Sequence, residues 1–243
     1  MASGADTAEL ERFAALAEHW WDETGPLAPL HKLNPIRVGY VRDRICAALG
    51  RDPLAERPLA GLAMVDVGCG GGLVCEPLAR LGVAVTGIDL APASIQAAAR
   101  HARAAGLAIE YRVATAEQLV AEPRRFDLVC AMEVVEHVPD QAGFLHACAA
   151  LVAPGGGLVL ATLNRTFRAF AFGIVAAEYV LGWLPRGTHS WQRFVRPSEA
   201  ARALRRAGLS IDDLTGVAYD PLRDRFRLSR DPAVNYMLFA TRG

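Results

Sequence analysis

The sequence predicts a doubly wound α/β fold built on one mostly parallel sheet, and three observations lead to this expectation. Short apolar strands alternate with helical segments through the middle of the chain. The first strand runs directly into a glycine-rich turn at residues 68–72, and the next strand ends at Asp89. A chain of 243 residues, 52% of them hydrophobic, is long enough to bury one substantial core.

The expected elements follow one another at the spacing of βαβ units. Seven strands are predicted, at residues 64–67, 83–88, 108–113, 126–131, 157–163, 209–217 and 234–241. Helices are predicted at residues 73–81, 92–105, 141–152 and 197–207. Pro92 favours the start of the second helix and Gly106 its end. The last two strands are expected to extend the sheet at one edge.

The first sixty residues are expected to form a helical lid (1–60) on a main domain at 61–243. Apolar residues recur at helical intervals from Leu10 to Trp21, which indicates a helix that packs against the core. Trp20 and Trp21 are candidates for the wall of an aromatic-substrate pocket, although aromatic stripes more often serve plain packing.

Charge and cysteine usage restrict the function classes. Acidic and basic residues balance at 26 each, so no overall field favours nucleic acid. The five cysteines are scattered and form no C-x-x-C pair, which fits a reducing compartment. The N-terminal segment lacks the pattern of a secretion signal, and no apolar run reaches the roughly 20 residues that span a bilayer. A cytoplasmic protein is expected.

The glycine turn indicates a nucleoside-bearing cofactor. It reads Asp66-x-Gly68-x-Gly70-x-Gly72, and such glycines allow a tight turn and a close approach of the backbone to a ligand. Asp89, one strand further on, can accept both ribose hydroxyls. Leu73 stands where the dinucleotide fingerprint has its third glycine, which disfavours a nicotinamide dinucleotide. The pattern resembles motif I of the S-adenosylmethionine-dependent methyltransferases.

Residues that follow the later strands complete the candidate site, because ligands bind at the carboxyl ends of strands in such sheets. Glu117 follows the third strand, where this methyltransferase class places a polar residue near the adenine. A plain helix cap by Thr115 explains that segment equally well. Met132 directly follows the fourth strand, and the resemblance to the methyltransferases implies a place for it near the adenine or the sulfonium.

Glu133, Glu136 and His137 have the spacing i, i+3 and i+4, so one helical turn would place them on one face. They could hold a divalent ion such as Mg²⁺, which would lower the pKa of a phenolic oxygen. In the alternative without metal, the carboxylates favour a helix N-terminus and His137 is the general base. The spacing leaves both open, and a purely structural role is the third interpretation.

Longer runs resemble the ubiquinone-biosynthesis O-methyltransferases over nearly the whole chain. The matching runs lie at residues 29–40, 132–139, 162–165, 185–189 and 235–237, and the narrowest signals within them are Asn34-Pro35-x-Arg37 and Gly187-Thr188-His189. The resemblance implies a seven-stranded Rossmann-like methyltransferase sheet whose last strand is antiparallel. It also implies O-methylation of 2-polyprenyl-6-hydroxyphenol and 3-demethylubiquinol.

The same resemblance implies cofactor contacts at Arg37, Gly68, Asp89 and Met132. Arg37 can hold the methionine carboxylate of S-adenosylmethionine in a two-point contact. Mitochondrial members of the family carry a divalent metal at the positions of Glu133, Glu136 and His137. All three side chains are present in this sequence.

An apolar insertion at 165–190, after the fifth strand, indicates contact with a membrane surface. It is rich in aromatic residues, is bounded by arginines and contains Glu178, so it is too short and too charged to span a bilayer. A buried helical cap over the active site is the alternative. Because a polyprenyl tail resides in the bilayer, we expect peripheral contact with the inner face of the membrane through residues 165–187.

Two rival functions come from other classes. A nucleotide-linked oxidoreductase is disfavoured by Leu73. A catalytically weak assembly factor of a quinone-biosynthesis complex would keep the cofactor fold without turning over substrate.

Overall fold

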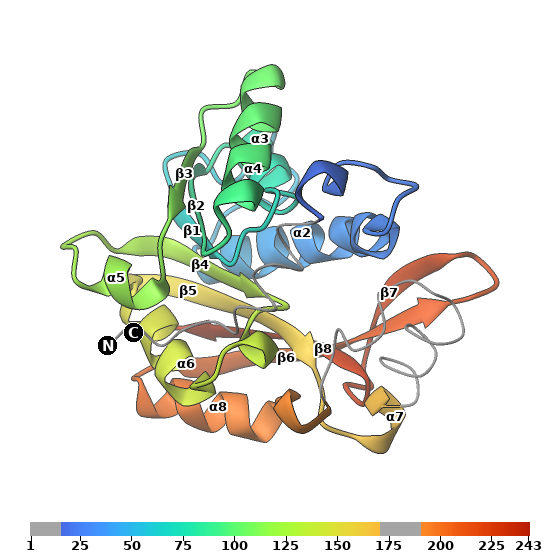
Figure 1. Ribbon diagram of the computed structural model, residues 1–243. Helices are drawn as coiled ribbons and strands as arrows, with labels where there is room; N and C mark the ends of the chain where they lie inside the picture. Colours follow the sequence, from blue (N-terminus) through green and yellow to red (C-terminus); the bar gives the residue numbers. More distant parts are fainter. Residues whose placement is uncertain (1–15, 171–190) are drawn as a thin grey trace.

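The computed structural model describes residues 16–170 and 191–243, and these form one sheet in the order β3-β2-β1-β4-β5-β8-β6-β7 (Figure 1). The strands are β1 Ala63–Val67, β2 Ala84–Asp89, β3 Glu110–Val113, β4 Phe126–Met132, β5 Val152–Leu163, β6 Ser210–Asp220, β7 Arg225–Ser229 and β8 Asn235–Thr241. Strands β1 to β5 pair in parallel. Strand β8 lies antiparallel between β5 and β6.

The strand order reverses at β1, which has β2 on one side and β4 on the other. Sheets of this type bind ligands at the carboxyl ends of the strands beside such a reversal. The segments that leave β1, β2 and β4 therefore form the candidate site.

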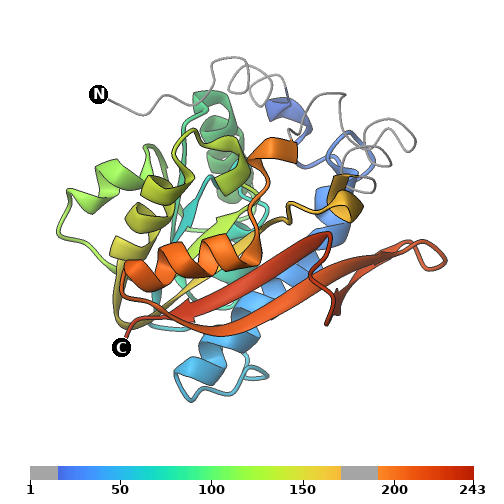
Figure 2. The same cartoon turned by 90° about the horizontal axis from the view of Figure 1, so that it is seen from below.

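Helices cover both faces of the sheet (Figures 1 and 2). The helical elements are η1 Ala17–His19, α2 Ala28–Ala48, α3 Cys75–Arg80, α4 Pro92–Ala104, α5 Ala116–Val120, η2 Val135–His137, α6 Gln141–Ala150, α7 Phe167–Ala169, η4 Trp191–Arg193 and α8 Pro197–Arg206. Helices α2, α3 and α4 lie on one face, and α5, α6 and α8 on the other.

Each face has its own hydrophobic core, because successive strand residues point to opposite sides. In β1, Met64 joins the core beneath α2 and α3, whereas Val65 joins the core beneath α6 and α8. Helix α2 contributes Val41 and Ile45 to the first of these cores, and both are fully buried. Helix α2 is therefore packed directly on the sheet, whereas the first part of the helix expected from Leu10 to Trp21 lies outside the described residues.

The described part of the sheet has eight strands, where seven were expected. The additional strand, β7, forms an antiparallel hairpin with β6 at the edge of the sheet. Its side chains are exposed or half-buried, so it lacks the apolar signal on which strand prediction depends. The reversed strand at the end of the chain is confirmed as β8.

Candidate active site

The glycine turn and the end of β2 are joined directly. Gly68, Gly70 and Gly72 have φ values of 73°, 51° and 86°, which side chains with a Cβ rarely tolerate. The Gly70 N–H donates to Asp89 Oδ2 at 2.9 Å, and the Ala91 N–H donates to Asp89 Oδ1 at 2.8 Å. Two predicted cofactor residues thus meet at the carboxyl ends of neighbouring strands.

The space that the missing Cβ atoms leave is filled by the protein itself. A Cβ on Gly68 would meet Val134, one on Gly72 would meet Tyr111, and those on Gly70 and Gly71 would meet Trp20. The glycines were expected to allow both a tight turn and a close approach of a ligand. The positive φ of Gly68, Gly70 and Gly72 accounts for the turn, and the approach of a nucleoside stays a prediction, from a side of the loop that these side chains leave open.

Asp66 lies beneath the turn and has little contact with solvent. It is 2% exposed, and the Cys75 thiol donates to its Oδ2 at 3.3 Å. Burial raises the pKa of Asp66 to about 7, and the positive charge of Arg37 opposes that rise. This contact joins the strand β1 to the start of α3, and the predicted place of Asp66 in the cofactor pocket is untested.

Arg37 reaches from α2 to the end of β4. Its Nη2 donates to Glu133 Oε1 at 2.9 Å, and Met132, beside Glu133, is 8% exposed. Arg37 itself is 5% exposed, and its Nε is buried without a hydrogen-bond partner among the described residues. A buried guanidinium N–H without a partner is costly unless a ligand supplies an acceptor. A carboxylate, such as that of a methionine moiety, has the required chemistry.

Glu136 is a buried carboxylate that is only partly hydrogen-bonded. It is 2% exposed, and Thr162 Oγ1 donates to its Oε2 at 2.7 Å, whereas its Oε1 is buried and no residue in the described part of the chain hydrogen-bonds to it. Burial raises the pKa of Glu136 to about 7; the charge of Glu133 adds to this shift and that of His137 opposes it. A group with this pKa can take up and release a proton near neutral pH.

The helical turn expected over residues 133–137 is not formed. Glu133 has φ 55° and lies outside η2, which covers only Val135–His137. Glu133 is directed to Arg37 and Glu136 to Thr162. Within residues 16–170 and 191–243, no three His, Cys, Asp or Glu side chains are grouped so that they could hold a metal ion. The residues as arranged do not fit a three-ligand metal site, and Mg²⁺ binding stays a prediction.

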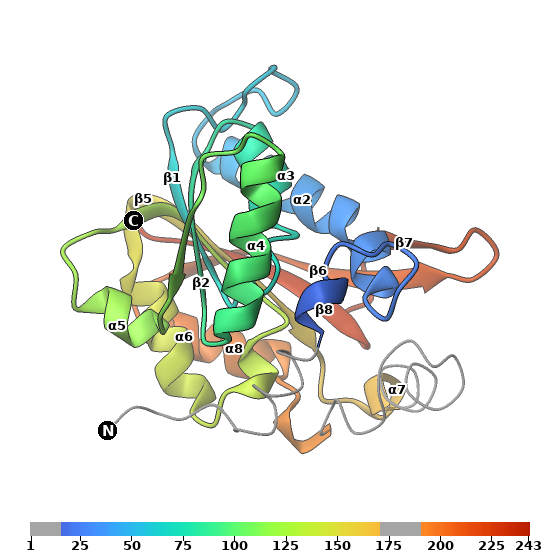
Figure 3. The ribbon, with the colours of Figure 1, turned by 45° about the horizontal axis from the view of Figure 1, so that its top comes forward.

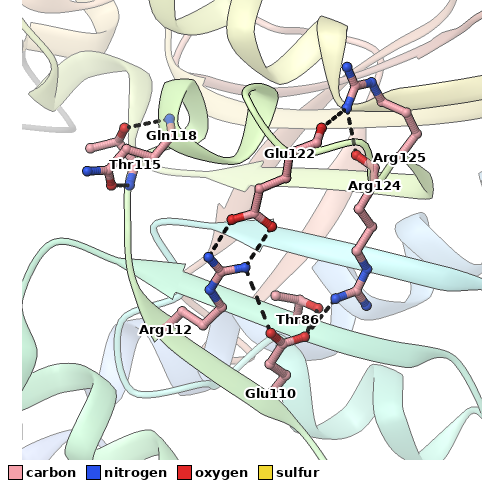
Figure 4. Close-up of polar contacts among 8 residues, drawn as sticks. All are labelled: Thr86, Glu110, Arg112, Thr115, Gln118, Glu122, Arg124 and Arg125. Atoms are coloured by element: carbon pink, nitrogen blue, oxygen red, sulfur yellow. Dashed lines mark hydrogen bonds and ion pairs between the residues drawn. The ribbon is translucent and has the colours of Figure 1, made fainter.

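The segment after β3 begins with a helix cap, and two ion pairs, Arg112–Glu122 and Glu110–Arg124, join its end to β3 (Figure 4). The Gln118 N–H donates to Thr115 Oγ1 at 3.2 Å, and Gln118 Oε1 accepts from the Thr115 N–H at 2.9 Å. This capping box confirms the cap interpretation of Thr115. Glu117 lies exposed in the first turn of α5, and its predicted place near the adenine is untested.

Two polar residues in the site carried no role in the sequence prediction. Thr162 donates a hydrogen bond to Glu136. Asn235 Nδ2 lies 3.5 Å from Glu133 Oε1, and the Asn235 Oδ1 is buried with no partner in the two described ranges. Because β8 is antiparallel to β5, its first residue lies beside Leu163 at the carboxyl end of β5. The signal that could have indicated Asn235 from the sequence is its polar side chain at the start of an apolar terminal strand.

The insertion begins with exposed aromatic side chains. Phe167, at the start of α7, is 79% exposed, Phe170 is 40% exposed, and their ring centroids are 6.3 Å apart. Phe172 and Trp183, on which the membrane prediction also rests, lie outside the described residues. Across the two described ranges, no helix is both long and apolar enough to traverse a bilayer.

Comparisons with known proteins agree on the class. A family model described as "Methyltransferase domain" matches residues 39–214. The ubiquinone biosynthesis O-methyltransferase of Methylobacterium sp. (strain 4-46) is 56% identical over 98% of this chain and 95% of that protein. The protein of the same name from Methylocella silvestris is 54% identical over 99% of this chain and 96% of that protein.

Solved structures share the fold at low sequence identity. A possible histamine N-methyltransferase from Thermotoga maritima is 14% identical, covers 95% of this chain and 100% of its own, and has a TM-score of 0.62. Magnesium protoporphyrin IX methyltransferase from Synechocystis PCC 6803, solved with S-adenosylhomocysteine, is 21% identical over 86% of this chain and 85% of its own, with a TM-score of 0.58. The Rossmann-like methyltransferase fold expected from the sequence is confirmed.

Proposed function

Because this chain belongs to the ubiquinone biosynthesis O-methyltransferase family, we propose that it transfers the methyl group of S-adenosylmethionine to ring hydroxyls of polyprenylated phenols and catechols. The two proposed acceptors are 2-polyprenyl-6-hydroxyphenol and 3-demethylubiquinol. The observation that carries this proposal is the contact between Gly70 and Asp89, which sets a carboxylate beside the glycine turn.

In the proposed complex the cofactor lies along the carboxyl ends of β1, β2 and β4. Asp89 keeps acceptor capacity for the ribose hydroxyls, because a carboxylate accepts about four hydrogen bonds and the two backbone N–H groups use two. Arg37 Nε donates to the methionine carboxylate, which gives that buried donor a partner. Met132 packs against the cofactor from the end of β4.

The chemical step is a displacement at carbon. The acceptor hydroxyl gives its proton to Glu136 or His137, and the oxygen forms a bond to the methyl carbon as the bond from that carbon to sulfur breaks. The products are the methyl ether and S-adenosylhomocysteine. Glu136 suits the proton transfer because burial has raised its pKa to about 7. Holding donor and acceptor in line supplies most of the acceleration.

A long polyprenyl tail requires that the enzyme reach its substrate at a bilayer. We place that contact at residues 165–187 and propose that the protein associates peripherally with the inner face of the membrane. The exposed rings of Phe167 and Phe170 support this placement. A complex with other quinone-biosynthesis proteins is compatible with the same surface.

The test is incubation of the purified protein with methyl-labelled S-adenosylmethionine and each proposed acceptor in detergent micelles. We expect label in the methyl ether of at least one acceptor, and a parallel assay with EDTA and with added Mg²⁺ tests the metal prediction. Binding of S-adenosylhomocysteine without turnover of either acceptor would instead favour the assembly-factor alternative. The family match leaves no observation in favour of an oxidoreductase.

A further inference from the structure

Trp20 occupies a slot between the glycine turn and α4. It is 7% exposed and packs with Leu73, which follows the glycine turn, and with Ala97 of α4. Its Nε1 donates to Ser94 Oγ at 3.3 Å, and Ser94 is 1% exposed near the start of α4. Figure 3 shows the blue N-terminal segment beside α4. The indole therefore bridges two segments that flank Asp89.

Trp21 makes a second attachment to the same turn. Its Nε1 donates to the Gly71 carbonyl at 3.0 Å. Its ring stacks on His101 with a centroid distance of 3.5 Å and an interplanar angle of 5°. His101 Nδ1 lies 2.6 Å from an oxygen of Glu76, which is fully buried in α3. The position of Trp21 is thus fixed from α3 and α4.

The packing of Trp20 against the turn requires glycine at position 71. Its neighbours Gly70 and Gly72 have positive φ, which alone accounts for glycine there, but Gly71 is not among the residues with positive φ. A Cβ on Gly71 would lie 2.2 Å from Trp20 Cγ and 2.4 Å from Trp20 Cβ. These atoms are at the root of the side chain, so no rotation of the ring relieves the contact. Glycine at position 71 is explained by Trp20.

We propose that Trp20 and Trp21 are positioning residues for the cofactor, which hold the glycine turn in its binding conformation from the N-terminal segment. The route from Trp20 to the ligand is short: the ring packs on Gly70, and the Gly70 N–H is bonded to Asp89. Neither indole needs to touch the cofactor. The inference rests on the proposed use of S-adenosylmethionine.

The test is a double-mutant cycle read by isothermal titration calorimetry with S-adenosylhomocysteine. Gly71→Ala is expected to raise the Kd about tenfold or more by displacing the turn. Gly39→Ala is the matched control, because Gly39 also lacks positive φ and a Cβ there would meet nothing within 4 Å. If the wild-type protein binds no S-adenosylhomocysteine, the proposed cofactor is wrong, and the role of Trp20 and Trp21 that rests on this cofactor is wrong as well.

Two replacements of Trp20 separate packing from ligand contact. Trp20→Gly removes the three Trp20 atoms nearest to a Cβ at position 71, so Gly71→Ala should cost little further affinity in that background. Trp20→Phe keeps Cβ and Cγ, so Gly71→Ala should remain costly there. The cofactor KM should rise in Trp20→Gly while kcat at saturating cofactor stays near wild type, which general unfolding would not produce.

Three results would overturn the proposal. The first is that the Gly71→Ala variant binds S-adenosylhomocysteine with the wild-type Kd. The second is an equal loss from Gly71→Ala with Trp20 present and with Trp20→Gly, which would mean that the ligand itself requires glycine there. If Trp20→Gly fails to fold by circular dichroism, Trp21→Phe replaces it; this variant loses the N–H that Gly71 accepts and should raise the Kd about threefold. Unchanged affinity in Trp21→Phe is the third.

Discussion

Arg37 and Glu133 form an ion pair with 2.9 Å between Nη2 and Oε1, and this pair ties α2 to the carboxyl end of β4. The side chain of Arg37 is 6% exposed and that of Glu133 is 20% exposed. Glu133 engages only part of the guanidinium, because Nε has no partner within residues 16–170 and 191–243. The pair therefore fixes the direction of Arg37 and leaves a buried donor for a ligand.

Arg37→Ala is expected to raise the Kd for S-adenosylhomocysteine about ten- to a hundredfold, through loss of a hydrogen bond between charged groups. Glu133→Gln should change that Kd far less, because it keeps the oxygen that orients Arg37. Calorimetric titration of both variants measures the difference. Arg42→Ala, on the same helix in an exposed pair with Asp43, is the control. Equal losses in Arg37→Ala and Arg42→Ala would remove Arg37 from the cofactor site.

Asp89→Asn is expected to weaken S-adenosylhomocysteine binding about tenfold, because the amide offers fewer acceptor positions to the ribose. Asp127→Asn is a matched control. The Asp127 carboxylate also accepts a backbone N–H, that of Ala63 at 2.8 Å, but it does so near the amino ends of β1 and β4. We expect Asp127→Asn to lower the melting temperature and leave the Kd unchanged. A loss of affinity shared by both variants would point to the stability of the sheet as the cause.

Local sequence predicts one half of this site well. The contact between Gly70 and Asp89 follows from the chain itself, because a turn after one parallel strand and the end of the next strand must lie together. Strands β1, β2 and β4 were located to within about two residues, since buried strands of a parallel sheet are continuously apolar.

The other half depends on tertiary packing. Arg37 and Glu133 are 96 positions apart, and neither local sequence indicates the other as partner. The positive φ of Glu133 broke the expected helical turn, because its backbone N–H continues the ladder of β4 by bonding to the Ala161 carbonyl. The sequence left Trp20 open between the wall of a substrate pocket and plain packing, and its place against the glycine turn follows from a slot that only the folded chain contains.

Glu136→Gln is expected to reduce kcat about a hundredfold, because the amide cannot take a proton from the acceptor hydroxyl. The wild-type rate should rise with pH through about 7, the pKa to which burial raises Glu136. Comparison of the two pH–rate profiles, with EDTA and with Mg²⁺, measures the effect. Full activity of Glu136→Gln without metal would remove Glu136 from the chemistry.

The free energy of unfolding should also depend on Glu136. Its pKa is raised from 4.5 to about 7, so between these values the folded protein binds a proton that the unfolded chain has released. The contribution of Glu136 to the free energy of unfolding is therefore fully present below about pH 4.5. It is lost as the pH rises through 7, and the loss is on the order of 3 kcal/mol.

Glu136→Gln should accordingly narrow the difference in stability between pH 5 and pH 8, as measured by urea unfolding. Part of the difference should persist, because burial raises the pKa of Asp66 to about 7 as well. Glu56→Gln, on an exposed loop, should leave the difference as it is in the wild type. An identical difference in the wild type and Glu136→Gln would show that Glu136 does not titrate with this shift.

Membrane association should depend on the aromatic side chains of the insertion. Replacing Phe167 and Phe170 with serine removes two exposed rings and should lower the fraction that floats with anionic liposomes by several-fold. Leu54→Ser is the control, because Leu54 is 83% exposed and its loop lies at the end of the molecule opposite α7 (Figure 3). The same flotation in the double variant as in Leu54→Ser would contradict membrane contact through these rings. Both proteins should bind S-adenosylhomocysteine like the wild type, because neither change touches the glycine turn or Arg37.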